Sequence, residues 1–215
     1  MTHSFDKDYW DRRWRRDRAG APVAMAVGPP NPHLVREVHD LEPGTALDAG
    51  CGAGAEAVWL ASRGWRVTGA DIADQALART AERAAASGVA DRVRPVRADL
   101  SVWEPDTTYD LVTTHYAHPA MPQLEFYDRI ASWVAPGGTL LIVAHLHHNG
   151  HRQGHGPAGA EPPASASVTA ADITARLDPA GWTVVTAEEA HRTVTGHGGH
   201  AVMVHDVVVR ATRRR

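Results

Sequence analysis

Short apolar runs alternate with segments of helical period along most of this chain. The runs that have the apolar pattern of β-strands lie at residues 45–48, 65–71, 93–99, 109–115, 139–145, 182–187 and 201–209. Apolar residues at helical spacing predict helices before the first run, at 31–39, and between the later runs, from about 55 and at 74–87, 123–134 and 170–177. Strands that alternate with helices predict a parallel sheet that is covered on both faces.

The last two apolar runs follow each other without a helix, and the glycine-rich residues 196–199 between them suit a hairpin turn. The pattern therefore predicts an α/β fold. We expect a Rossmann-like, seven-stranded, mostly parallel sheet with helices on both faces and an antiparallel last strand. The length of 215 residues fits one domain over 1–215. Within it we expect an N-terminal helical lid segment (1–40), a cofactor-binding core (45–146), a flexible loop (147–168) and a C-terminal helix with strands (169–215).

A glycine-rich stretch follows the first apolar run. Asp48 ends that run, and Gly50, Gly52 and Gly54 follow at every second position before the helical segment begins. Glycines allow positive φ and close approach of a ligand to the main chain, and the following helix start presents free N–H groups. A dinucleotide site has the spacing G-x-G-x-x-G, whereas an acid before the turn repels a pyrophosphate and suits an ammonium group. The alternative is a glycine-rich turn in another α/β protein.

Acidic residues also end the second and third runs. Asp71 lies 17 residues beyond Gly54, where an acid can accept hydrogen bonds from two ribose hydroxyls, and Asp99 ends the third run. Ligands of open α/β sheets bind outside the carboxyl ends of the strands, so these acids and the glycines should share one edge. Packing alone does not account for acids at three successive strand ends.

Together these landmarks resemble motif I and the following acidic motifs of the class I S-adenosylmethionine (SAM)-dependent methyltransferases. The resemblance covers residues 45–145 and implies that SAM is the cofactor. It implies that Gly50 and Gly52 meet the methionine part with main chain, that Asp48 orders the loop or meets the amine, and that Asp71 binds the ribose. The residues expected to bind the cofactor are Trp10, Trp14, Asn31, Asp48, Ala49, Gly50, Cys51, Gly52, Asp71, Ile72, Asp99, Leu100 and His115. Of these, Ile72, Asp99 and Leu100 would hold the adenine.

Residues 4–18 predict a short amphipathic helix in which Trp10 and Trp14 share one face. Such a helix before the core resembles the N-terminal segment of thiopurine- and tellurite-type methyltransferases, where it closes over the cofactor. Aromatic faces also favour a sulfonium cation. Simple packing of this helix onto the domain is the alternative.

Three histidines mark the ends of the fourth and fifth strands. His115, His118 and His145 are the candidate catalytic residues, because histidine is best suited to take a proton near neutral pH. Packing or bonding to a neighbour is the alternative for each. The histidines at 145–151, with His197 and His200, are metal-capable, but their loop is rich in glycine and proline, so we predict no metal site.

Composition narrows the classes of partner. Net charge is −3, which provides no basic field for nucleic acid, and no run approaches the length of a membrane span. Cys51 is the only cysteine and the N-terminus lacks a signal-peptide pattern, which fits a reducing cytoplasm. No Asn/Asp-Pro-Pro-Tyr segment follows the fourth strand, which argues against methylation of a base amine. The pattern indicates no oligomeric state.

We therefore expect a SAM-dependent methyltransferase that acts on a small-molecule acceptor. The resemblance to tellurite- and thiopurine-type enzymes suggests sulfur, selenium or tellurium as the accepting atom, although the fold also serves nitrogen and oxygen acceptors. Two alternatives stay open: a metal-assisted enzyme that uses the histidine-rich loop, and a non-catalytic SAM-binding regulatory module.

Overall fold

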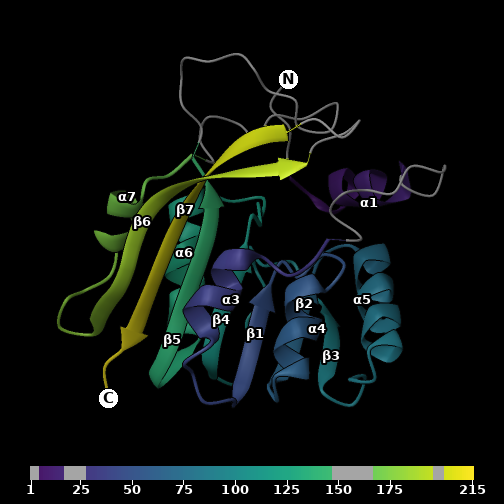
Figure 1. Cartoon of the computed structure of the whole chain (residues 1–215), viewed down its shortest axis with the longest axis horizontal. Helices are drawn as coiled ribbons and strands as arrows, with labels where there is room; N and C mark the ends of the chain where they lie inside the picture. Colours follow the sequence, from purple (N-terminus) through teal and green to yellow (C-terminus); the bar gives the residue numbers. More distant parts are fainter. Residues whose placement is uncertain (1–4, 17–27, 147–166, 196–200) are drawn as a thin grey trace.

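A computed structural model describes residues 5–16, 28–146, 167–195 and 201–215. Its centre is a seven-stranded sheet of order β3-β2-β1-β4-β5-β7-β6 (Figure 1). The strands are β1 (Thr45–Ala49), β2 (Arg66–Asp71), β3 (Val93–Arg97), β4 (Tyr109–His115), β5 (Val134–His145), β6 (Trp182–Thr195) and β7 (Ala201–Arg213). The first five pair in parallel, whereas β7 runs antiparallel to both β5 and β6. The predicted fold class is confirmed.

Helices cover both faces of this sheet. Helices α3 (Pro32–Val38), α4 (Ala55–Ser62) and α5 (Asp74–Ala86) pack one apolar cluster against it, and α6 (Gln123–Ser132) and α7 (Ala170–Thr174) pack another on the opposite face. Strands β1, β4 and β5 are buried along most of their length, which explains their continuous apolar sequence. Helix α1 (Lys7–Arg16) lies beside α5 at the carboxyl edge of the sheet (Figure 1).

Strand β5 begins earlier than the sequence pattern predicts. Helix α6 ends at Ser132, and the chain enters the sheet at Val134, five residues before the predicted strand at Thr139. An irregularity in the pairing of β4 with β5 accommodates the segment between these residues, where Gly137 has a φ of 84°. Proline and glycines usually end a strand pattern, so the pattern placed this segment in a loop.

Strands β6 and β7 are also longer than predicted. The last residue of β5, His145, pairs with Asp206, so residues 191–195 of β6 and 201–205 of β7 continue beyond it as a two-stranded hairpin arm. The arm extends over the carboxyl edge of the sheet (Figure 1). The apolar pattern predicts the strand at 201–205 of this arm, but it does not predict residues 191–195 of β6, whose sequence is mostly polar. Within the part of the chain that the structure describes, no helix has the length and apolar character needed to cross a membrane.

Candidate functional site

The glycine stretch forms a tight loop between β1 and α4 at the carboxyl edge. Gly50, Gly52 and Gly54 have φ values of 83°, 52° and 74°, which side chains rarely adopt. A Cβ on Gly50 would lie 2.4 Å from the Cβ of Ala117, and one on Gly54 would lie 2.7 Å from Thr80. The loop therefore requires glycine for its conformation at all three positions, and for space at Gly50 and Gly54.

Asp71, at the end of β2, holds this loop in place. Its Oδ2 accepts a hydrogen bond from the N–H of Gly52 at 2.9 Å, and its Oδ1 accepts one from the N–H of Ala73 at 2.9 Å. Burial raises the pKa of Asp71, although these backbone hydrogen bonds oppose the shift. The hydroxyl of Thr80 donates to the carbonyl of Gly52 at 2.9 Å and fixes the other side of the loop.

Asp48, at the end of β1, is buried below the loop without full hydrogen bonding. Its side-chain Oδ2 has no hydrogen-bond partner among the described residues. Burial, together with the charges of Glu56 and Asp71, raises the pKa of Asp48 well above its usual value. A buried carboxylate oxygen without a partner, next to the glycine loop, fits the ammonium group of a ligand.

Cys51 lies inside the loop and faces the core. Its sulfur is buried, and a Cβ on Gly69 would lie only 3.1 Å from it. Burial raises the pKa of the Cys51 thiol well above its usual value. The side chain therefore acts as a small buried residue and is unsuited to nucleophilic catalysis.

The predicted adenine residues lie beside the loop at the same edge. The N–H of Ala98 donates to the carbonyl of Asp71, which brings the start of the segment after β3 next to the end of β2. Asp99 accepts hydrogen bonds from the N–H and the hydroxyl of Ser101 at 3.0 and 2.6 Å. Leu100 is buried in the core, and Ile72 is half-buried. The structure thus brings Ile72, Asp99 and Leu100 close to Asp71.

Helix α1 lies over the glycine loop. Trp14 is 4% exposed and packs against Ala53, Ala73 and Ala76, and its ring lies 3.4 Å from the place of a Cβ on Gly52. Trp10 is half-buried beside it. Trp14 therefore packs against the main chain of the loop, and Trp10 packs next to Trp14. Phe5 was not predicted to belong to the site.

Phe5 extends this aromatic cover toward the end of β4. Its ring lies 6.1 Å from the ring of Trp10 and 5.6 Å from that of His118. The Nδ1 of His118 lies 3.1 Å from the Oε1 of Gln123, whose amide donates to the carbonyl of Ala117. The Gln123 amide thus orients His118, and the Phe5 ring packs against it.

The other two candidate histidines have different surroundings. His115 has a side chain only 5% exposed, with its Nδ1 4.0 Å from Asp48, and burial lowers its pKa. His145 has a side chain 31% exposed, with its Nδ1 3.6 Å from Asp206. The structure therefore places His115 on the Asp48 side of the edge and His145 on the side of β7. His118 lies next to Phe5, which precedes α1.

A polar cluster around Asp206 adjoins these histidines, and the sequence analysis missed it. Asp206 is fully buried and accepts hydrogen bonds from His33 (3.1 Å), Tyr116 (3.0 Å) and Arg192. Burial alone would raise the pKa of Asp206, but hydrogen bonds from His145 and Arg192 hold it well below its usual value. We define the Asp206 cluster as His33, Tyr116, His145, Arg192 and Asp206.

Tyr116 connects this cluster to the glycine loop. It is the only non-glycine residue with positive φ in the described part of the chain, at 56°. Its hydroxyl accepts hydrogen bonds from Arg192 (2.8 Å) and from Asn31 (3.0 Å), and its ring stacks on His145 at 4.0 Å. Asn31, expected to bind the cofactor, also caps α3 through the N–H of His33. No local pattern in the sequence could have shown these contacts, because they join residues from five separate segments.

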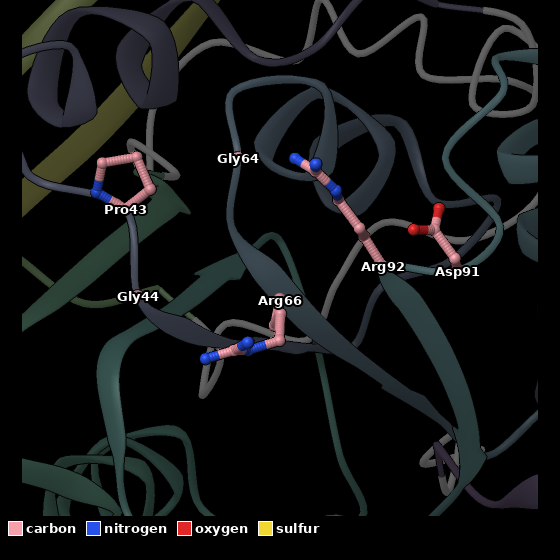
Figure 2. A pocket seen from close by; sticks show the side chains of 6 residues that line it. All are labelled: Pro43, Gly44, Gly64, Arg66, Asp91 and Arg92. Carbon is pink, nitrogen blue, oxygen red and sulfur yellow. The ribbon is translucent and has the colours of Figure 1, made fainter.

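The histidine-rich loop predicted to bind no metal lies largely outside the described residues, as do His197 and His200. Among the residues that are described, no group of three or more metal-ligating side chains is present. A cavity of about 510 Å³ lies at the opposite edge, lined by Pro43, Gly44, Gly64, Arg66, Asp91 and Arg92 (Figure 2). These residues precede or begin β1, β2 and β3. Ligands of open α/β sheets bind at the carboxyl ends, so this cavity is not the candidate site.

Comparisons with known proteins agree with this geometry. Residues 46–138 match the family model for a methyltransferase domain. The probable thiol methyltransferase 2 of Arabidopsis thaliana is 31% identical over 141 residues, which are 62% of this chain and 60% of that protein. The chain spans 34% to 64% of the length of the curated relatives that it matches.

Solved structures show the same fold. A SAM-dependent methyltransferase from Thiobacillus denitrificans, in complex with S-adenosyl-L-homocysteine, is 25% identical, with a TM-score of 0.51 over 57% of this chain and 52% of that one. A structure concerned with the conversion of a disulfide bond into a thioacetal group during echinomycin biosynthesis has a TM-score of 0.70 and 22% identity. It covers 97% of this chain and 91% of that one.

Proposed function

We propose that this chain, whose residues 46–138 match a methyltransferase-domain family, is a class I SAM-dependent methyltransferase that transfers a methyl group from SAM to a small-molecule nucleophile. The observation that carries this proposal is the glycine loop with Asp48 and Asp71. The glycines keep side chains away from the main chain of the loop, and the unpartnered Oδ2 of Asp48 suits a cation beside it. A methionine amine satisfies this arrangement, and a pyrophosphate does not.

The residues around the loop suit the remaining parts of the cofactor. The main chain of Ala49, Gly50, Cys51 and Gly52 faces the methionine part. Asp71 accepts one hydrogen bond at Oδ2 from Gly52 of the loop and one at Oδ1 from Ala73, and its other lone pairs can accept the two ribose hydroxyls. Ile72, Asp99 and Leu100 hold the adenine, and Trp10 and Trp14 cover the site as a lid segment of one domain.

SAM supplies a methyl group on a sulfonium, so its departure needs no further activation. The chain mainly aligns the acceptor with the methyl group and excludes water, which can lower the barrier by about 7–11 kcal/mol. A base is needed only where the acceptor keeps its proton. We assign that role to His118 or His145, because each has an oriented ring on the acceptor side. His115, buried next to Asp48, belongs to the cofactor side.

The acceptor proposed is a small molecule with a sulfur, nitrogen or oxygen nucleophile. The relation to a thiol methyltransferase favours sulfur. We also propose that the chain binds neither nucleic acid nor a membrane and resides in the cytoplasm, from its charge of −3 and its single, buried cysteine.

Calorimetric titration with S-adenosylhomocysteine, with NAD as the comparison ligand, tests the cofactor assignment. We expect micromolar binding of S-adenosylhomocysteine, a loss of about tenfold to a hundredfold for Asp71→Ala and a smaller loss for Asp71→Asn, which keeps one acceptor oxygen. Asp91→Ala, at the opposite edge, is the matched control and should bind normally. A preference for NAD contradicts the proposal.

A screen with methyl-labelled SAM then tests transfer. Thiols, phenols, carboxylic acids and amines serve as acceptors, and replacement of both His118 and His145 by alanine tests the base. Tight cofactor binding without transfer to any acceptor would instead favour the non-catalytic SAM-binding module.

A further inference from the structure

Arg192 brings a positive group to the acceptor side of the site. It lies in the hairpin arm, where it pairs with Val204 beyond the end of β5. Its side chain is 27% exposed, while the Asp206 side chain that it contacts is fully buried. Of the two side chains in this ion pair, only that of Arg192 is partly exposed to solvent.

The hydrogen bonds of Arg192 leave part of its donor set open. Its Nε donates to Asp206, and its Nη2 donates to the Tyr116 hydroxyl at 2.8 Å. Within the described part of the chain, Nη1 makes no hydrogen bond. A guanidinium carries five N–H donors in a planar fork that matches a carboxylate. The two bonds that are made fix the plane of the group, so an incoming carboxylate meets an oriented donor.

Asp206 does not occupy the remaining N–H donors of Arg192. Its Oδ1 accepts from Tyr116 and lies 3.6 Å from His145, and its Oδ2 accepts from His33 and Arg192. Both oxygens are thus directed into the cluster. In contrast, the acids of the cofactor side, Asp48 and Asp71, lie around the glycine loop, so the two sides of the site differ in charge.

Tyr116 places Arg192 next to the reacting region. The residue after it, Ala117, lies against Gly50 of the glycine loop. The left-handed conformation of Tyr116 costs of the order of 1–3 kcal/mol, and such strain persists only where surrounding contacts fix it. Its hydroxyl is fixed by Arg192, Asn31 and Asp206. The cluster therefore holds the end of β4, the glycine loop and the guanidinium in one arrangement.

We infer that Arg192 binds a carboxylate of the methyl acceptor, so that the site selects acceptors that carry a carboxylate besides the nucleophile. This inference rests on the proposed methyl transfer and assigns Arg192 as a specificity-determining residue. The nucleophile then lies toward Ala117 and His118, between the guanidinium and the glycine loop.

Matched pairs of acceptors test the inference by steady-state kinetics with labelled SAM. The pairs are 3-mercaptopropionate with 3-mercaptopropionamide, 4-hydroxybenzoate with 4-hydroxybenzamide, and 4-aminobenzoate with 4-aminobenzamide. We expect kcat/KM to favour the carboxylate member by about tenfold or more. Arg192→Gln should lower kcat/KM for the carboxylate member about tenfold more than for the amide member, through a higher KM, and Arg192→Lys should retain part of the preference.

Arg210→Gln is the control, because Arg210 lies on β7 four residues from Asp206 and pairs with Asp40. It should leave the preference unchanged. Equal losses for both members in Arg192→Gln show that Arg192 only supports the arm, and they overturn the inference. So does the absence of any carboxylate preference, including the case in which no member reacts although S-adenosylhomocysteine binds. Failure to bind S-adenosylhomocysteine instead refutes the proposed function itself.

Discussion

Two buried carboxylates on the two sides of the site have opposite surroundings. Asp48, on the cofactor side, has an oxygen without a partner in the described structure and a raised pKa. Asp206, on the acceptor side, is bonded at both oxygens and has a lowered pKa. A satisfied buried charge supports the fold, whereas an unsatisfied one costs stability and is ready for a ligand. The cofactor side thus keeps a buried carboxylate oxygen available for a ligand, which lowers the stability of the free protein. On the acceptor side, the hydrogen bonds of the carboxylate are already made without a ligand.

The largest effect should follow from Asp206→Asn. The amide keeps the shape but removes the charge and places N–H groups against His33 or Arg192, so we expect a loss of about 3–5 kcal/mol in the free energy of unfolding. S-adenosylhomocysteine affinity should stay within a few-fold, because Asp206 belongs to the acceptor side. Urea unfolding and calorimetry measure the two quantities.

Asp40→Asn is the matched control for this variant. Asp40 is an exposed partner of Arg210, and its loss should cost less than about 1 kcal/mol. If Asp206→Asn unfolds at the same urea concentration as the wild-type protein, the Asp206 cluster does not stabilise the fold, and the contrast between the two carboxylates fails.

The next effect concerns the cofactor side. Gly50→Ala should lower the free energy of unfolding by about 1–2 kcal/mol for a side chain at positive φ and by about 1–3 kcal/mol for overlap with Ala117. It should also abolish S-adenosylhomocysteine binding. Gly88→Ala is a close control, because Gly88 has a φ of 71° but nothing lies within 4 Å of its Cβ position. Gly88→Ala should lose only the stability that a side chain at positive φ costs, and it should bind S-adenosylhomocysteine normally. Equal binding of S-adenosylhomocysteine by both variants would show that the glycine loop at Gly50 is not the cofactor site.

These two sides also differ in how far the sequence predicts them. The glycine loop and Asp71 lie in short contiguous segments, and strand ends mark them, so pattern and spacing locate them without a structure. The Asp206 cluster joins residues up to 173 positions apart, as in the bond between His33 and Asp206. Arg192 lies in the later, mostly polar part of β6, beyond the predicted strand at 182–187, so no apolar period marks that part of the strand or the side chain.

The helical segment at the N-terminus shows an intermediate case. The spacing of Trp10 and Trp14 predicts a helix with one aromatic face, which the structure contains. The pattern left two partners open for that face, the cofactor and the rest of the domain, because the choice depends on packing between α1 and α5. The contact of Phe5 with His118 likewise depends on packing between residues that are distant in sequence. Local order was readable from the pattern, and the pairing of surfaces distant in sequence was not.

The smallest effect expected is a gain in the stability of the free protein. Asp48→Asn removes a buried carboxylate whose pKa is raised by burial and by Glu56 and Asp71, so it should stabilise the free protein at pH 7 by about 1 kcal/mol. It should also weaken S-adenosylhomocysteine binding by about tenfold to a hundredfold, because the ammonium loses its charged partner. Calorimetry and urea unfolding on the same samples test both directions.

The pH dependence of the free protein separates this explanation from simple repacking. A carboxyl whose pKa is raised on folding binds its proton more tightly in the native than in the unfolded state. Its unfavourable contribution therefore grows as pH rises from the usual value near 4 through the raised pKa. Asp48→Asn should remove that decline, so its advantage over wild type should vanish below about pH 4. Asp206, with a lowered pKa, gives the opposite slope, since its stabilisation is complete above about pH 4 and is lost as pH falls further. If the advantage of Asp48→Asn is the same at pH 4 and pH 7, it comes from packing, and Asp48 is not a charge held ready for the cofactor amine.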